Sequence, residues 1–344
     1  MKTATRLAVS AAAAVAVAVL GLSAKESAAT NGKRKRSRVR RKAPTWEDSP
    51  YGKLLLDCRC QGGTEALTRF RGAINIPYDV YCSIYESYIE CNPPMADARG
   101  QVSTSTAIKV MVALSFLSNA SQLKILSLLS NLSAEVCRKA TIKVIGFIEQ
   151  QLFPKKVLWP TVQNGLLDST LKEYNAAGLP GCIGSIDCTH VHWDKCPASH
   201  RSLYAGKEKF PTAAFQVVSS HSRRILSCTK VLTISYNFVN NYSTMYKAFP
   251  GTYGDATIIK YDQFVASIAS GAYDRYTYRL YDAAGDSYME RGCYLICDQG
   301  YGECRYLVPT APNAVGPALE FSDHIESTRK VHTLLHIYFV TYKV

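Results

Sequence analysis

One segment of the sequence combines an acid with the pattern of a half-buried strand. Residues 181–194 read Gly-Cys-Ile-Gly-Ser-Ile-Asp-Cys-Thr-His-Val-His-Trp-Asp; small and apolar residues lead to Asp187, and the following positions alternate. Because strand side chains have a period of two, Asp187 is expected to share a face with Thr189, Val191 and Trp193, opposite Cys188, His190, His192 and Asp194. A carboxylate among apolar strand residues is costly unless a cation compensates it. Asp187 is therefore predicted to be the first ligand of a divalent metal ion.

A second acid ends another apolar segment. Residues 293–302 read Cys-Tyr-Leu-Ile-Cys-Asp-Gln-Gly-Tyr-Gly, which is typical of a buried strand with Asp298 at its tip. The glycines that follow allow a ligand to approach the backbone closely. Asp298 is therefore predicted to face a phosphate-bearing ligand.

Carboxylates from distant sequence positions are the donor set that phosphodiester chemistry needs. Hydrolysis or transfer develops charge on the attacking and leaving oxygens, and two cations about 3.5–4 Å apart stabilise both. Magnesium suits such a site because it takes oxygen ligands and keeps some of its waters.

Four nitrogen and sulfur donors lie in the same segment and raise the question of zinc. They are Cys188, His190, His192 and Cys196. The segment lacks a CxxC knuckle, and all four residues fall within nine positions. This spacing disfavours a structural zinc site.

The segment Gly-Ser-Ile-Asp-Cys-Thr-His-Val, followed by Gly-Lys-Glu-Lys at 206–209, resembles the PIF/Harbinger class of DDE transposases and their domesticated nuclease relatives. The resemblance runs from about Trp46 to about Lys330. It implies an RNase H-like core in which Asp187 bridges two Mg²⁺ (or Mn²⁺) ions and Asp255 and Asp298 supply further ligands. Water or a DNA 3′-hydroxyl would then attack in line.

The resemblance gives Asp255 its role as the second metal ligand. Asp255 lies in Gly-Thr-Tyr-Gly-Asp-Ala-Thr-Ile, residues 251–258, a glycine-bounded turn before an apolar stretch. Without the resemblance, a helix N-cap is the preferred interpretation, since Asp favours that position.

Two departures from the family pattern affect the predicted activity. Residues 230–250 are interpreted as an insertion, which leaves the placement of Asp255 relative to Asp187 open. The segment Glu326-Ser-Thr-Arg-Lys330 matches the start of the family's final motif, but Thr333 stands where its last glutamate is expected. Glu326 is a weak substitute ligand, since two helical turns separate the positions by roughly 10 Å. Metal binding is expected to survive in part, and strand transfer to be severely impaired or lost.

The elements that position these acids predict an α/β fold. Segments around Phe215–Ser219 and Ile225–Thr229 are expected to be strands beside the one that carries Asp187, and an RNase H-like mixed sheet flanked by helices is predicted. The predicted domains are a leader and basic arm (1–44), a helical region (45–175) and a C-terminally truncated nuclease core (176–344).

The helical region offers two interpretations. Helices are predicted over Thr104–Asn119, Gln122–Leu132 and Ala134–Phe153, separated by Asn-Ala-Ser and Asn-Leu-Ser turns. The pattern alone favours a small helical bundle, whereas the resemblance implies a DNA-contacting helix-turn-helix unit.

The net charge and the distribution of basic residues indicate where in the cell the protein is expected to act. The 344 residues carry a net charge of +13, concentrated in residues 33–42, which hold eight basic groups and no acid. This run favours nuclear entry or phosphate contact.

Residues 1–29 have the layout of a signal or transit peptide, so secretion or an organelle is the alternative; their apolar run is too short to span a membrane. The twelve scattered cysteines favour reduced thiols in an intracellular protein.

The sequence therefore predicts a transposon-derived DDE nuclease or transposase that binds DNA, with a degenerate or domesticated DNA-binding protein as the alternative. The resemblance implies a Myb/SANT-like accessory partner. A secreted protein of unrelated role is a third hypothesis, and it requires cleavage of the leader and oxidised thiols.

Overall fold

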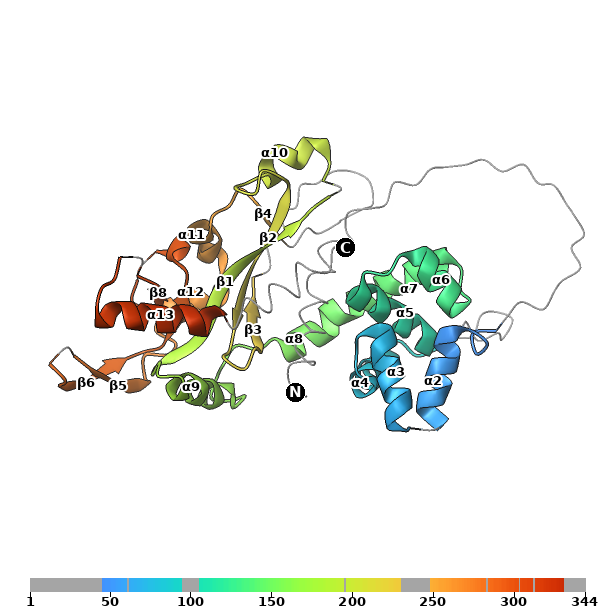
Figure 1. The fold of residues 1–344 in the computed structure, drawn as a ribbon, viewed down its shortest axis with the longest axis horizontal. Coiled ribbons are helices and arrows are strands. Elements are labelled where there is room, and N and C mark those ends of the chain that lie inside the picture. The colour runs from blue at the N-terminus through green and yellow to red at the C-terminus, as the bar shows by residue number, and fades with distance from the viewer. Residues whose placement is uncertain are drawn as a thin grey trace, which may run out of the picture. The chain divides into compact units, whose positions relative to one another are not determined.

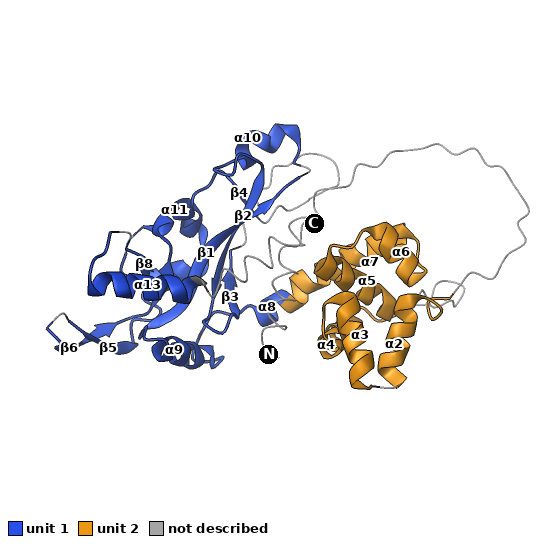
Figure 2. Ribbon diagram, viewed as in Figure 1, with its two compact units in different colours: residues 1–11, 153–343 blue, residues 12–152, 344 orange. Residues whose placement is uncertain are grey.

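The computed structural model describes residues 45–94, 105–229 and 248–330, except the single positions 61, 195, 283, 303 and 312. This part of the chain divides between Leu152 and Phe153 into two compact units, here called the helical unit and the sheet unit (Figures 1 and 2). The predicted leader, the basic run 33–42, residues 230–247 of the predicted insertion and Thr333 lie outside the described residues.

The helical unit is built around one largely buried helix. Its helix α5 buries side chains on every side, including each residue from Val110 to Leu114, as expected of a helix at the centre of a bundle. The other helices pack around this centre. The helices of this unit are α2 (Pro50–Cys60), α3 (Thr64–Ile74), α4 (Tyr78–Cys91), α5 (Thr106–Asn119), α6 (Leu123–Ser130) and α7 (Ala134–Phe147).

The turns that separate the last three helices follow from their residues. Ala120 and Asn131 adopt left-handed conformations at the ends of α5 and α6, and the hydroxyl of Ser133 accepts a hydrogen bond from the Val136 N–H at the start of α7. The three predicted helices are therefore confirmed. The last of them leaves α geometry at Phe147 and continues as a π-helical segment, Ile148–Leu152.

The sheet unit contains a mixed sheet, so the predicted α/β class is confirmed. The strand order is β3-β2-β1-β7-β8, with β4 paired to β2. Strands β1, β2 and β3 are antiparallel, whereas β7 and β8 add in parallel on the other side of β1. The strands are β1 (Cys182–His192), β2 (Thr212–Ser219), β3 (Ile225–Cys228), β4 (Phe249–Pro250), β7 (Tyr294–Cys297) and β8 (Leu307–Pro309).

Helices cover both faces of this sheet. On one face α12 (Gln263–Ala269) packs Phe264 and Val265 against Ile186 of β1. On the other face α13 (Pro317–Lys330) packs Ile325 against alternate residues of the strands. The short helix α11 (Asp255–Ile258) contacts β2 and β4 through Ile258, and α9 (Leu166–Ala176) also packs on the sheet.

The sequence-based boundary at residue 175 lies inside the sheet unit, because Leu167 and Tyr174 of α9 belong to its core.

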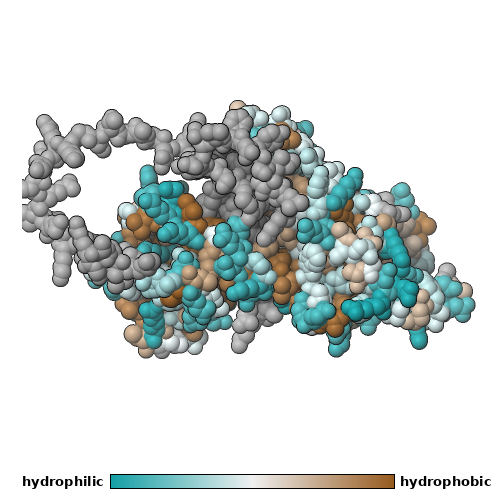
Figure 3. Space-filling model, turned by 180° about the vertical axis from the view of Figure 1, so that it is seen from behind, coloured by the Kyte–Doolittle hydropathy of each residue, from teal (hydrophilic) through white to brown (hydrophobic). Residues whose placement is uncertain are grey.

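Strands β5 (Thr277–Tyr281) and β6 (Ser287–Arg291) form a two-stranded sheet that was not predicted. On the face shown in Figure 3, hydrophobic residues of the described chain form separate patches among hydrophilic ones. Within the described ranges, no helix is long and apolar enough to cross a membrane.

Candidate active site

The site lies where β1 runs past the end of its parallel neighbour. Strand β7 pairs with β1 as far as Ser185 and ends at Cys297. The antiparallel pairing with β2 continues to His192. From Asp187 onward, β1 therefore has a sheet edge along which side chains from both faces can approach one another.

Asp187 faces helix α13. Its Oδ2 accepts a hydrogen bond from Arg329 Nη1 at 3.4 Å, and its Oδ1 accepts one from the Cys188 N–H at 2.9 Å. Arg329 also donates through Nε and Nη2 to the two carboxylate oxygens of Glu326, each at 3.0 Å. Both partners of the Asp187–Arg329 pair are largely buried, with side chains 19% and 14% exposed. Glu326 therefore contacts Arg329 directly, and it is linked to Asp187 only through the Arg329 side chain.

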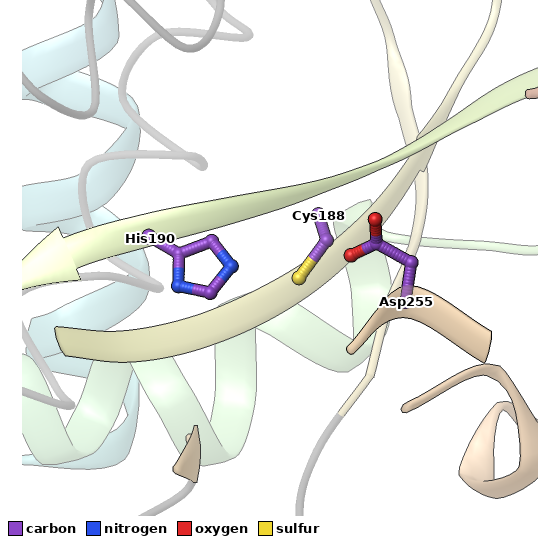
Figure 4. A group of neighbouring side chains, drawn as sticks. All are labelled: Cys188, His190 and Asp255. Carbon is purple, nitrogen blue, oxygen red and sulfur yellow. The ribbon is translucent and has the colours of Figure 1, made fainter. Parts of the chain in front are cut away.

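The opposite face of β1 carries a different set of donors. Figure 4 shows Cys188 and His190 projecting to one side of the strand, with Asp255 reaching toward Cys188 from the start of α11. One ligand atom from each of these three residues lies within 4.8 Å of the other two. Asp255 is not the N-cap: Gly254 holds that position, and Asp255 is the first residue of the helix.

Asp298 approaches the same place from the tip of β7. Its Oδ1 accepts a hydrogen bond from the Gly300 N–H at 2.8 Å. A Cβ added to Gly300 would lie 2.6 Å from Asp255 Oδ2 and 3.0 Å from Asp298 Oδ1, so both carboxylates occupy the space that a side chain would fill. The glycine after the strand tip is what lets the two acids come together.

Tyr301 is a buried residue of the short segment that follows Asp298. It is 6% exposed, and its hydroxyl has no hydrogen-bond partner among the described residues. Burial, and then Cys188, Asp255, Asp187 and Asp298, raise the pKa of Tyr301. All three predicted aspartates therefore act electrostatically on one buried phenol, although among the described groups their oxygens do not all lie within 4.8 Å of one another.

The segment 206–209 also contributes to the site. A Cβ on Gly206 would lie 1.9 Å from the backbone oxygen of Gly251, so only glycine permits this crossing of two backbone segments. The crossing brings Lys207 near Asp255, where its charge opposes the rise in the pKa of that carboxyl. Lys207 is thus a basic group beside the acids.

A comparison with protein families identifies the kind of chain that carries this site. The model of a family described as plant transposon protein matches residues 158–330. The chain belongs to this plant transposon protein family. No curated protein and no solved structure matches the chain. The plant transposon match contains every residue of the site, from Asp187 to Arg329, and it begins after the helical unit ends.

The acids of this plant transposon protein repel one another electrostatically. The pKa of Asp255 is raised, first by burial and then by the negative charge of Asp298, with Asp187 adding to it. The nearby thiol of Cys188 works against this rise. Burial, then the charges of Asp255 and Asp187, in turn raise the pKa of Cys188. This excess of negative charge is the condition that a bound cation would relieve.

We expect Asp255→Asn to stabilise the metal-free protein at neutral pH. A carboxyl whose folded pKa lies above its unfolded value of about 3.9 contributes stability at low pH that is lost as the pH rises through the folded pKa. The difference in unfolding free energy between Asp255→Asn and wild type should therefore be near zero at low pH and grow toward neutrality. Denaturant unfolding in chelator between pH 3 and pH 7 measures it. A variant that is less stable than wild type at pH 7 would contradict the repulsion.

Sequence reasoning left several members of the site without a role. Gly300 lies in the glycine-containing segment 293–302, and Lys207 lies in the basic segment 206–209. The glycines and the basic residues of these segments could have indicated their roles. Tyr301 and Arg329 also lie in motifs named above, but no role could be assigned to them, because the first is an ordinary aromatic residue and the second lies 142 residues from Asp187.

Proposed function

We propose that this chain is a DDE nuclease or transposase of the PIF/Harbinger type that cuts DNA phosphodiesters with divalent metal ions. The observation that carries the proposal is the approach of Asp255 and Asp298 to each other at Gly300, from two separate elements, with the charge of Asp187 on β1 acting on Asp255 as well. The strand order also supports an RNase H-like sheet. Strands β1, β2 and β3 are antiparallel, and β7 and β8 lie parallel to β1 on its other side.

The residues present fit Mg²⁺ or Mn²⁺. Carboxylate oxygens are the donors that these hard ions prefer. The absence of a side chain at Gly300 lets Asp255 and Asp298 approach each other, and the hydroxyl of Tyr301 is buried without a partner in the described chain. When bound between these carboxylates, the ions would polarise the phosphate and stabilise the attacking and leaving oxygens.

The chain's own residues would hold and neutralise the reacting groups. Asp187, fixed on β1 by its hydrogen bond from the Cys188 N–H, would hold metal from the α13 face. Asp255 and Asp298 would hold it from the α11 side and from the tip of β7. Lys207 would contribute positive charge to a DNA phosphate at this edge.

A non-catalytic DNA-binding protein is the second candidate, and Arg329 favours it. Its guanidinium pairs with both Asp187 and Glu326, so an internal cation already compensates part of the negative charge. In this case the sheet unit would act as a scaffold. The helical unit and the basic run 33–42 would engage DNA.

Plasmid nicking separates the two candidates. Full-length protein is incubated with supercoiled plasmid in Mg²⁺, in Mn²⁺ or in chelator, beside Asp187→Asn. The control is Asp194→Asn, a carboxylate on the same segment whose side chain is 61% exposed and pairs with His192 at 3.0 Å. Metal-dependent nicking that Asp187→Asn abolishes and Asp194→Asn retains supports the nuclease. Retarded DNA mobility without nicking supports the scaffold and would overturn the nuclease.

We also propose nuclear location and a Myb/SANT-like accessory partner, both on the family resemblance. The basic run 33–42 would direct entry. Microscopy of a tagged chain with this run neutralised, and co-precipitation with a Myb/SANT-like protein, test the two expectations separately.

A further inference from the structure

We propose that Cys188, His190 and Asp255 form a binding site for a zinc-class transition metal ion. This site goes beyond the proposed Mg²⁺ chemistry: its donors are sulfur, nitrogen and oxygen, and it shares one residue, Asp255, with the carboxylates. Binding of the ion does not require that the protein cut DNA.

The fold places the three donors together. On β1 the period of two puts Cys188 and His190 on one face, and the start of α11 delivers Asp255 to the same face (Figure 4). Their ligand atoms lie within 4.8 Å of one another. Zinc bonds of about 2.0–2.3 Å require the three to draw closer. Asp255, at the first position of a four-residue helix, can supply that movement by side-chain rotation.

A buried hydroxyl orients the imidazole. Thr212 Oγ1 lies 3.1 Å from His190 Nδ1, and Thr212 is 1% exposed. If Nδ1 carries the proton and donates it to this oxygen, Nε2 is the basic nitrogen that can bind metal. Such an outer partner is the usual companion of a metal-binding histidine.

The remaining contacts also suit a metal. The Cys188 sulfur and the Asp255 carboxylate lie near one another (Figure 4), so a cation bound to both could replace the thiol proton. Three protein ligands leave a fourth position for water, as in open zinc sites.

The donor set decides the class of ion. Thiolate and imidazole select zinc and related transition metals, whereas Mg²⁺ prefers oxygen ligands. The sequence had suggested four candidates in one segment, and the structure retains two of them. His192 instead pairs with Asp194, and the thiol of Cys196 is directed at the Pro197 carbonyl. The third ligand, Asp255, comes from a distant part of the chain.

Cobalt spectroscopy tests the site without reference to DNA cleavage. Reduced, metal-free full-length protein is titrated with Co²⁺, and the thiolate-to-cobalt charge-transfer absorbance is followed. We expect a saturable band at one equivalent that Zn²⁺ displaces. Cys188→Ser should remove the band, and His190→Ala should weaken Co²⁺ binding by at least about 100-fold.

Two matched variants control for unspecific effects. Cys196→Ser and His192→Ala alter the same residue types in the same segment and should retain the band. Circular dichroism verifies that each variant is folded. Absence of a stoichiometric band in the wild type, or a band that persists in folded Cys188→Ser and His190→Ala, would overturn the proposal.

Asp298→Asn distinguishes this proposal from the nuclease. Asp298 is not one of the three donors, so the variant should keep the cobalt band while it loses any Mg²⁺-dependent nicking. A wild-type protein with the band and no nicking supports the metal site and refutes the nuclease. A wild-type protein that nicks DNA but shows no cobalt band supports the nuclease and refutes the metal site.

Discussion

Gly300→Ala is expected to lower the Mg²⁺ affinity of the site by about 10- to 100-fold or more while the protein remains folded. The new methyl group would lie 2.6 Å from Asp255 Oδ2 and 3.0 Å from Asp298 Oδ1, and the carboxylates must rotate apart to admit it. Since displacing reacting groups by about 1 Å costs on the order of 100-fold in rate, nicking should fall at least as far. Calorimetric Mg²⁺ titration and the plasmid assay measure the two effects.

Gly254→Ala is the matched control for this substitution. Gly254 adjoins Asp255, has φ −78°, and would place a Cβ with no other atom within 4 Å. It should leave Mg²⁺ affinity unchanged. If Gly300→Ala binds Mg²⁺ and nicks DNA like the wild type, Asp255 and Asp298 do not act together.

Asp262→Ala is expected to cause the largest loss of stability among single substitutions near the site. Asp262 is 1% exposed and caps α12, with Oδ1 accepting from the N–H groups of Phe264 and Val265. Its Oδ2 accepts from Gln216 Nε2 at 2.5 Å and Thr229 Oγ1 at 2.7 Å. The substitution leaves four donors unpaired in the interior, so we expect a loss of about 3–5 kcal/mol.

Thermal unfolding measures this loss, as a decrease of roughly 10 °C in the melting temperature. Asp282→Ala is the comparison, since Asp282 Oδ1 accepts two backbone hydrogen bonds in an exposed turn of the hairpin. Water can replace that carboxylate, so its loss should cost less than about 1 kcal/mol. Equal effects of the two substitutions would show that burial of Asp262 does not matter.

Strands with a strong local pattern could be predicted from the sequence. The alternation after Asp187 predicted β1 and its two faces, and contacts of Asp187 with α13 and of Cys188 with the α11 side follow that division. The apolar segment before Asp298 predicted β7. Strand β4 was missed because it is two residues long and falls at the end of the predicted insertion.

The site could be predicted only in part, because its geometry depends on long-range packing. Sequence reasoning weighed Asp255 as a metal ligand against an N-cap, yet the buried cap is Asp262, seven positions later. Both aspartates precede apolar residues, so local pattern could not separate them. The roles of Asp187, Asp255, Asp298 and Glu326 as metal ligands stay predictions until the assays above are done.

The extension of β1 beyond β7 ties the chemistry of this protein to the alignment of a single strand. Since neighbouring residues of β1 supply Asp187 to one face and Cys188 to the other, a shift by one residue would exchange the two donor types between helices α11 and α13. Deletion of one residue between Gly184 and Asp187 would therefore move the carboxylate to the fully buried position of Ile186, against Phe264 and Val265, and the thiol to the position that faces Arg329. One such deletion would therefore separate the proposed carboxylate set and the proposed sulfur and nitrogen donors from their partners at the same time.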